Sequence, residues 1–320
     1  MINLSIIIPH YNTPIKLKRL LDSIPMRNDL EVIVVDDRSN KDLEVLDHIK
    51  EEFKTDNIFF FENNRINKGA GTCRNIGMEH AKGQWFLFAD ADDYFMEGFL
   101  DKVKLYFETN NDIVFFNPTS WDEVNKKISN RHINYSNLVK NYLDDKSHAY
   151  NELYLRYRFV VPWSKLINAK FIKEKAIKFD EVIASNDEMF SIKAGSNARV
   201  IEVSKQIIYC VTKDKGTLTQ NISIPVFRAR LETGSHKYTY IKSKLSKKDF
   251  EALELRSIGY LVSVIKYRLG LKELVRTYRF LKDHRFRLVN KSLLNPWMIL
   301  RKISFHIHDL FKSKSFKTKN

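Results

Sequence analysis

The sequence is poor in cysteine and has no apolar run long enough to cross a bilayer. Cys73 and Cys210 are its two cysteines, a number that disfavours a disulfide framework and is typical of proteins from reducing compartments. A membrane-spanning helix needs about 20 mostly apolar residues, and no stretch approaches this length. Residues 1–3 lead directly into the first apolar run, so we expect no signal peptide. These absences predict a cytoplasmic protein.

Acidic residues are scarce in one part of the chain. Residues 226–320 contain 23 Lys and Arg but only 7 Asp and Glu, which gives a net charge of +16. Residues 1–225 contain 31 Lys and Arg and 32 Asp and Glu, which gives a net charge of −1. The overall excess of +15 therefore lies entirely in the C-terminal segment. We predict a folded domain over residues 1–225 and a basic helical segment over residues 226–320.

Three carboxylates, those of Asp90, Asp92 and Asp93, directly follow the apolar run at 86–89. Carboxylates clustered at the end of a buried strand repel one another and lose hydration, unless a cation neutralises them. Hard oxygen ligands at this density suit Mg²⁺ or Mn²⁺, ions that often share their coordination sphere with phosphate oxygens. The alternative is structural, with Asp92 or Asp93 capping a helix that starts near Tyr94.

Strand and helix patterns alternate over the first 90 residues. Apolar, mostly β-branched or aromatic runs predict strands at 6–8, 31–35, 58–61 and 85–89. Helical patterns lie between them, at about 15–24, 43–53 and 71–81. This alternation predicts an α/β fold whose ligand lies beyond the carboxyl ends of parallel strands. The first strand lacks a following Gly-x-Gly-x-x-Gly turn, which argues against a dinucleotide-binding oxidoreductase.

Four short motifs occur in an order and spacing that resemble the inverting family 2 glycosyltransferases of the GT-A fold. They are Ile-Ile-Pro-x-Tyr-Asn at 7–12, Val-Val-Asp-Asp-x-Ser at 34–39, Asn-Lys-Gly-x-Gly-x-x-Arg-Asn-x-Gly at 67–77 and Asp-Ala-Asp-Asp at 90–93. The resemblance is close over residues 1–120 and looser to about residue 220. It implies a nucleotide-sugar-binding half at 1–120, an acceptor-binding half at 121–225 and a central, mostly parallel sheet flanked by helices.

The resemblance also implies a UDP-sugar donor and a metal cofactor, Mn²⁺ or Mg²⁺. A carboxylate near the base can accept the imide N–H of uracil, and in the family the second Asp of the pair Asp36 and Asp37 does so. Asp90 and Asp92 match the metal-binding DXD pair, with Asp92 as the main ligand and Asp93 ordering the turn. The other donor-site residues predicted from the motifs are Pro9, Tyr11, Asn12, Lys68, Arg74 and Ala91. The alternative for Arg74 is an ordinary solvated helix arginine.

An inverting transfer needs a general base, because the acceptor hydroxyl loses its proton as it attacks the anomeric carbon. The family has Glu-Asp before a helix at this point, and here Asn186 and Asp187 stand there. The resemblance makes Asp187 the base and places Asn186 and Glu188 on the acceptor side, with Glu188 and Asp180 as alternative bases. In the structural alternative, Ser185 or Asn186 caps a helix that starts at Asp187.

Two further segments resemble parts of the family's cleft. The Trp-x-Lys-Leu segment at 163–166 predicts Trp163 in the acceptor site, where its ring suits the apolar face of a sugar, with core packing as the alternative. Lys213 and Lys215 are predicted to close over the diphosphate and stabilise the leaving group, with a solvated basic loop as the alternative.

The C-terminal segment predicts two or three helices with apolar stripes. One stripe contains Leu255, Ile258, Val262, Ile265 and Leu269. A last helix at 296–311 places Trp297, Leu300, Ile307 and Phe311 along one face beside basic residues. This composition predicts peripheral binding to the anionic inner leaflet, with docking on the catalytic domain as the alternative.

The functional prediction is therefore transfer of a hexose or N-acetylhexosamine from a UDP-sugar to a hydroxyl of a lipid-linked glycan acceptor, in capsule, O-antigen or lipooligosaccharide synthesis. A non-enzymatic membrane- or nucleic-acid-binding protein is the second hypothesis. It leaves Asp90, Asp92 and Asp187 without a role, and no nucleic-acid-binding module accompanies the basic charge. We therefore expect no nucleic-acid partner, and the sequence predicts no particular oligomeric state.

Overall fold

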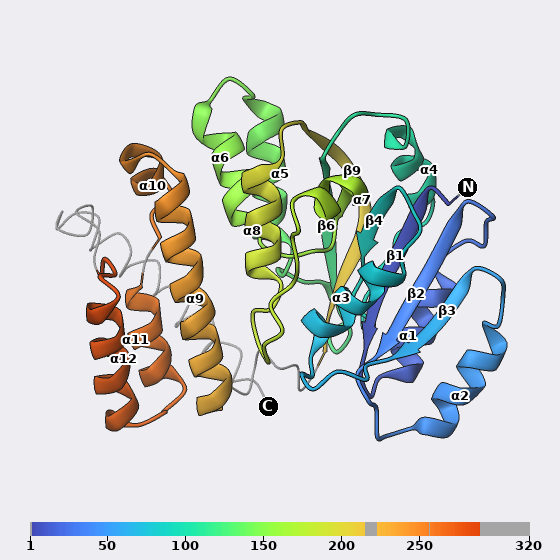
Figure 1. Cartoon of the computed structure of the whole chain (residues 1–320), viewed down its shortest axis with the longest axis horizontal. Coiled ribbons are helices and arrows are strands. Elements are labelled where there is room, and N and C mark those ends of the chain that lie inside the picture. The colour runs from blue at the N-terminus through green and yellow to red at the C-terminus, as the bar shows by residue number, and fades with distance from the viewer. Residues whose placement is uncertain (1, 215–222, 256, 289–320) are drawn as a thin grey trace, which may run out of the picture. The chain divides into compact units, whose positions relative to one another are not determined.

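A computed structural model of the chain describes residues 2–214, 223–255 and 257–288 (Figure 1). The fold divides into two compact units, 1–249 and 250–320, and each is described by itself. Lys215 and the helix predicted at 296–311 lie outside the described residues.

The first half of the sheet is parallel, as the alternation of strand and helix patterns predicts. Strands β3, β2, β1 and β4 are neighbours in this order, and every pair among them is parallel. The strands are β1 (Leu4–His10), β2 (Leu30–Asp36), β3 (Ile58–Glu62) and β4 (Trp85–Phe88). Their connections are α1 (Pro14–Asp22), α2 (Leu43–Glu52) and α3 (Ala70–His80). The prediction of an α/β fold is confirmed.

The second half of the sheet is mixed. Strand β8 (Lys165–Asn168) runs antiparallel to both β4 and β6 (Ile113–Asp122), and β9 (Ile201–Lys213) runs parallel to β6. Two short strands complete it, β5 (Tyr94–Phe95) on β9 and β7 (Lys127–Ile128) on β6. The alternative prediction of a helix that starts near Tyr94, capped by Asp92 or Asp93, is wrong. Tyr94 instead begins strand β5, whose backbone pairs with β9. The next helices are α4 (Phe99–Val103) and the 3₁₀ turn η1 (Lys104–Tyr106).

Among the described residues, five helices of the first unit follow residue 121, most of them in the half predicted to bind the acceptor. They are α5 (Ile133–Asp144), α6 (Ala149–Arg158), α7 (Ala169–Glu174), α8 (Glu188–Asn197) and α9 (Ile224–Lys244). Helix α9 packs on α8 within the first unit, although its basic composition assigned it to the C-terminal segment. The boundary predicted at residue 225 follows the change in net charge along the sequence. The boundary in the structure, after Asp249, follows the packing of the chain into two units.

The described part of the second unit is helical. Helix α10 (Lys247–Ala252) spans the boundary, and α11 (Ile258–Lys266) and α12 (Leu271–Asp283) follow. The predicted stripe does not form one buried face, because Val264 is buried while Val262 and Ile265 are exposed. Within the described ranges, no helix is both long and apolar enough to span a bilayer.

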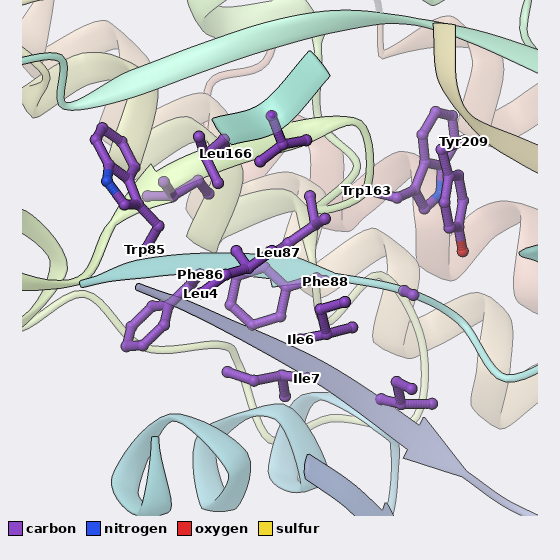
Figure 2. Packing of buried hydrophobic residues seen from close by; sticks show 14 of the residues in the cluster. Leu4, Ile6, Ile7, Trp85, Phe86, Leu87, Phe88, Trp163, Leu166 and Tyr209 are labelled. Carbon is purple, nitrogen blue, oxygen red and sulfur yellow. The ribbon is translucent and has the colours of Figure 1, made fainter. Parts of the chain in front are cut away.

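The core lies on both faces of the central strands. Every residue of β1 is buried, and Leu4, Ile6 and Ile7 pack among the aromatic side chains of β4 (Figure 2). Burying such a side chain stabilises the fold by about 1.5–3 kcal/mol. At the amino edge of the sheet, the buried Glu31 carboxylate accepts hydrogen bonds from Ser5 Oγ at 2.6 Å and from the N–H groups of Lys82 and Gly83. The buried charge at the amino edge is therefore satisfied by the protein itself.

The close approach of α3 to β1 yields a stability prediction. A Cβ atom at Gly77 would lie 2.4 Å from Ile7 Cγ2 in the fully buried core. Gly77→Ala should lower the free energy of unfolding by about 1–3 kcal/mol, because overpacking forces the backbone apart. Urea unfolding followed by circular dichroism measures this loss. Gly259→Ala is the control, since a Cβ there meets no atom within 4 Å; equal midpoints for the two variants would contradict the packing.

Candidate active site at the carboxyl edge of the sheet

Asp36 orders the loops that follow β1 and β2. Its carboxylate lies 2.7 Å from His10 Nδ1 and accepts hydrogen bonds from the backbone N–H and the hydroxyl of Ser39. Burial by itself raises the pKa of Asp36, but the His10 and Ser39 hydrogen bonds outweigh it and lower the pKa below the usual value. Asn12 continues this link, because its N–H donates to Ser39 Oγ at 2.8 Å. Asp36 is therefore an ionised structural group at the edge.

Asp37 ties the end of β2 to the loop before α3. Its two oxygens accept hydrogen bonds from Asn63 Nδ2 at 2.6 Å and from the N–H of Gly69 at 2.7 Å. A carboxylate has about four acceptor positions, so these bonds leave capacity for one more N–H donor. Lys68 lies beside this loop with its ammonium 5.8 Å from the ring centre of Tyr11, which is half exposed. Pro9, in contrast, is buried inside β1.

Arg74 joins three motifs that are distant in the sequence. Its guanidinium donates to Asp90 Oδ1 at 2.5 Å and to Asn186 Oδ1 at 3.0 Å. It also lies over the Phe179 ring, 5.2 Å from the centroid. The side chain is 3% exposed, so the alternative of a solvated helix arginine is wrong. The structure brings the Gly-rich motif, the Asp-Ala-Asp-Asp motif and the predicted base segment together at this residue.

A glycine allows this junction to close. The segment before α8 passes over the first turn of α3, where a Cβ on Gly71 would lie 2.2 Å from the carbonyl oxygen of Asp180. Asn75 of the same helix donates to the carbonyl of Phe179 at 3.0 Å and accepts from its N–H at 2.9 Å. The base segment is therefore fixed against α3 by backbone contacts as well as by Arg74.

The Asp-Ala-Asp-Asp motif forms a tight turn between β4 and β5. Burial raises the pKa of Asp92 above its usual value, and repulsion from Asp90 adds to the rise. The charges of Lys16 and Arg131 act in the opposite direction. Ala91, which lies between Asp90 and Asp92 in the sequence, is buried. Asp92 is thus a carboxylate whose ionised form is disfavoured by its surroundings.

The turn suits a divalent cation that also binds phosphate. Asp92 and Asp90 offer hard oxygen ligands, and a cation there would relieve the burial and repulsion that raise the pKa of Asp92. No group of three or more His, Cys, Asp and Glu that could hold a metal ion occurs among the described residues. Mg²⁺ is commonly held by one or two carboxylates with substrate phosphates supplying further ligands. The donor set therefore fits an ion shared with a nucleoside diphosphate.

Asp187 occupies the position just before α8. The helix begins at Glu188, and the Asp187 side chain makes no capping hydrogen bond. The alternative of a Ser185 or Asn186 cap is wrong, because Asp187 itself holds the N-cap position. The Asn186 amide oxygen instead accepts a hydrogen bond from Arg74. The pKa of Asp187 is raised to about 6, chiefly by burial; the Arg74 charge opposes this rise, and the charges of Asp90 and Glu188 contribute to it. A carboxylate with this pKa is suited to accept a proton near neutral pH.

Two other predicted site residues form ion pairs inside the protein. Glu188 forms an ion pair at 2.5 Å with Lys237 of α9. Lys213 Nζ lies 2.8 Å from Asp122, and this bond holds the pKa of the Asp122 carboxyl well below its usual range. Each charge is neutralised by its partner, so neither side chain reaches a ligand without breaking an ion pair.

Trp163 lies in the core. It is 6% exposed and stacks on Tyr209, with 5.9 Å between ring centroids and 19° between planes (Figure 2). The edge-on ring of Tyr135 lies 5.1 Å away. With its ring faced by Tyr209 and bordered by Tyr135, Trp163 offers no open face to a sugar. The core-packing alternative therefore describes its side chain.

Several residues at this edge were missed by the sequence reasoning. Arg19 of α1 donates to the carbonyl of Asp92 and pairs with Glu123, while Lys16 and Arg131 contribute positive charge near Asp92. Lys16 and Arg19 are spaced as neighbours on a helix that follows the first motif, a signal that a search for basic groups near the acidic turn would have found. Arg131 carries no such signal, because tertiary folding alone brings it there.

A model of the family described as glycosyl transferase family 2 matches residues 5–174. The chain is 29% identical over 213 residues to a poly(ribitol-phosphate) beta-glucosyltransferase of Bacillus spizizenii, covering 64% of this chain and 31% of that protein. It is 25% identical over 223 residues to the poly(ribitol-phosphate) beta-N-acetylglucosaminyltransferase TarS of Staphylococcus aureus, covering 68% and 36%. The matched region thus spans about a third of these relatives.

The fold is also similar to that of solved structures. The crystal structure of S. aureus TarS 1-349 in complex with UDP-GlcNAc superposes with a TM-score of 0.68 at 20% identity, covering 88% of this chain and 80% of that one. This likeness shows the GT-A fold. Because the family model matches more than half of the chain, the protein belongs to glycosyl transferase family 2.

Proposed function

We propose that the protein is an inverting glycosyltransferase that moves a sugar from a UDP-sugar to a hydroxyl group of a glycan. One observation carries the proposal: the buried Arg74 guanidinium bonds both Asp90 and Asn186, and so joins the acidic turn to the segment of Asp187. The carboxylates proposed to hold the metal ion and a carboxylate with a pKa of about 6 thus belong to one charge network. A direct displacement needs these two functions at one site.

The donor half is assigned to binding and orientation. Asp37 accepts the imide N–H of uracil, with Asn63 and Gly69 fixing its carboxylate, and Tyr11 and Lys68 lie beside the nucleoside. The structure of TarS with UDP-GlcNAc supports a UDP donor, and the names of the two relatives support glucose or N-acetylglucosamine as the sugar.

Asp92 and Asp90 would hold Mn²⁺ or Mg²⁺. The ion, when bound, supplies positive charge for the departing diphosphate. A mannosyltransferase of Pyrobaculum calidifontis with GDP-Man and Mn²⁺ has the same fold at a TM-score of 0.51 and 14% identity, which supports a metal at this site. Lys16, Arg19 and Arg131 add fixed positive charge around the turn. Lys213 and Lys215 are proposed as further diphosphate contacts, and Lys213 would leave its ion pair with Asp122 to make one.

Asp187 is assigned as the general base. It takes the proton from the acceptor hydroxyl as this attacks the anomeric carbon, on the face opposite the leaving UDP. Burial keeps its proton affinity high, while the Arg74 charge keeps the ionised form accessible near neutral pH. Asn186 and Glu188 lie on either side in sequence and are assigned to the acceptor. The polymers named for the relatives support a surface glycan as acceptor.

The metal assignment predicts a loss at Asp92. Asp92→Asn removes a charged ligand and should lower transfer by about 100-fold or more, because a metal ion contributes several kcal/mol of transition-state stabilisation. Transfer and calorimetric UDP binding should be measured at saturating Mn²⁺ and again with excess chelator. Asp101→Asn, a surface carboxylate paired with Lys104, is the control. Full wild-type activity in chelator would refute the metal assignment.

The base assignment predicts opposite effects on rate and stability. Asp187→Asn should lower kcat by about 10²–10⁴-fold with UDP affinity unchanged. In the wild type, the rate should rise tenfold per pH unit up to about pH 6 and then level off. Because the folded pKa of Asp187 exceeds its usual 3.8, ionisation destabilises the fold progressively from about pH 4 to 6 and fully above this window.

At pH 7.5, Asp187→Asn should therefore raise the free energy of unfolding, by at most about 3 kcal/mol. Glu188→Gln, at the alternative base, should keep the wild-type pH profile. A sigmoidal profile that persists in Asp187→Asn, or a product that keeps the anomeric configuration of the donor, would exclude Asp187 as the base.

The basic segment at 226–320 is proposed to hold the enzyme on the cytoplasmic face of the membrane, where a lipid-linked acceptor is available. Each Lys or Arg near an anionic leaflet contributes about 1 kcal/mol of attraction. The double variant Arg276→Glu/Arg279→Glu on α12 should weaken binding to anionic vesicles by about tenfold or more and leave UDP-sugar hydrolysis unchanged. Co-sedimentation at low salt measures this, with Lys140→Glu/Lys170→Glu as the control. Equal binding by both double variants would contradict the assignment.

A further inference from the structure

Strand β9 contacts the acidic turn independently of α3. The hydroxyl of Tyr209 accepts a hydrogen bond from the N–H of Asp90 at 2.8 Å and donates one to Asp93 Oδ2 at 2.9 Å. Tyr209 is 0% exposed, and its ring stacks on Trp163 and meets Phe95 edge-on. One phenol group therefore contacts both the first and the last residue of the Asp-Ala-Asp-Asp motif.

Thr212 of the same strand completes this clamp. Its N–H donates to Asp93 Oδ1 at 2.7 Å, and its hydroxyl donates to the carbonyl of Asp92 at 2.6 Å. Both oxygens of Asp93 are thus occupied by β9, and Asp93 is 2% exposed. The carboxylates of Asp90 and Asp92 receive no hydrogen bond from Tyr209 or Thr212, which bind only the backbone of those two residues.

We propose that Tyr209 is a positioning residue for the donor: through Asp93 and the Asp90 backbone, it holds the carboxylates of Asp90 and Asp92 together for the metal diphosphate. The inference rests on the proposed function, because it needs Asp90 and Asp92 to bind this group. Two neighbouring carboxylates repel each other. A turn held only at its ends by β4 and β5 can relieve this repulsion by separating them. Bonds from a separate strand to the turn oppose that movement.

The stack with Trp163 gives the clamp a second anchor. Trp163 belongs to the segment entering β8, in the acceptor half, whereas the turn belongs to the donor half. The Trp163 to Tyr209 stack therefore fixes the hydroxyl relative to both halves, and it assigns Trp163 a supporting role behind the site. Removing the hydroxyl while keeping the ring separates the two contributions, since the stack remains and the hydrogen bonds are lost.

The test is Tyr209→Phe, measured by calorimetry with UDP and Mn²⁺ in addition to steady-state transfer. We expect UDP binding in the presence of Mn²⁺ to weaken by about tenfold, equivalent to about 1.4 kcal/mol. The KM for the donor and the Mn²⁺ concentration for half-maximal activity should rise by a similar factor, with kcat changed less. Thr212→Val, which removes the bond to the Asp92 carbonyl and keeps the N–H, should shift the same two quantities in the same direction.

Tyr157→Phe is the matched control, because it also removes a buried tyrosine hydroxyl, one bonded to Ser196 at 3.1 Å. It should lower the melting temperature about as much as Tyr209→Phe, without changing UDP binding. UDP binding within twofold of wild type in folded Tyr209→Phe overturns the proposal, as does equal weakening in Tyr157→Phe. A wild-type protein that binds no UDP with Mn²⁺ refutes the proposed function itself, and the positioning role with it.

Discussion

The site depends on the placement of one buried positive charge. The Arg74 guanidinium replaces lost hydration with bonds to Asp90 and Asn186 and with the face of the Phe179 ring. A buried arginine without such partners would be strongly destabilising. The segment before α8 and the acidic turn must therefore both close on α3 for the fold to be stable. The same requirement brings Asp187 near Asp90 of the acidic turn.

The carboxylates at this edge of the sheet differ in their hydrogen bonds and in their pKa values. Asp36, Asp37 and Asp93 accept hydrogen bonds from the protein and organise the loops. Asp92 and Asp187 have raised pKa values because burial is not fully compensated, and burial raises the pKa of Asp93 as well despite its hydrogen bonds. Uncompensated carboxylates at one edge of a sheet are expensive to maintain, and they are the groups to which we assign metal binding and proton transfer. Within the Asp-Ala-Asp-Asp motif, Asp93 thus orders the turn, whereas the proposed chemical roles fall on Asp90 and Asp92.

Much of the parallel half of the sheet can be predicted from the sequence. The βα alternation of residues 4–88 is local, because each strand and helix carries its own periodicity. The mixed half is harder to predict, since β5 and β7 contain only two residues each and exist through pairing with longer strands. Trp163 illustrates the limit at the level of side chains: its sequence context suits a cleft, but the stacked ring of Tyr209 places it in the core.

The sequence by itself determined the parallel half of the sheet, the edge at which the acidic motifs gather and the family to which they are similar. Those features follow from periodicity and from the rule that parallel strands present their carboxyl ends at one edge. Only the tertiary structure decided that Arg74 is buried between Asp90 and Asn186, that Lys213 is paired with Asp122 and that Tyr209 supports the acidic turn. These contacts join residues far apart in the chain, and their energies depend on burial, which no local pattern specifies.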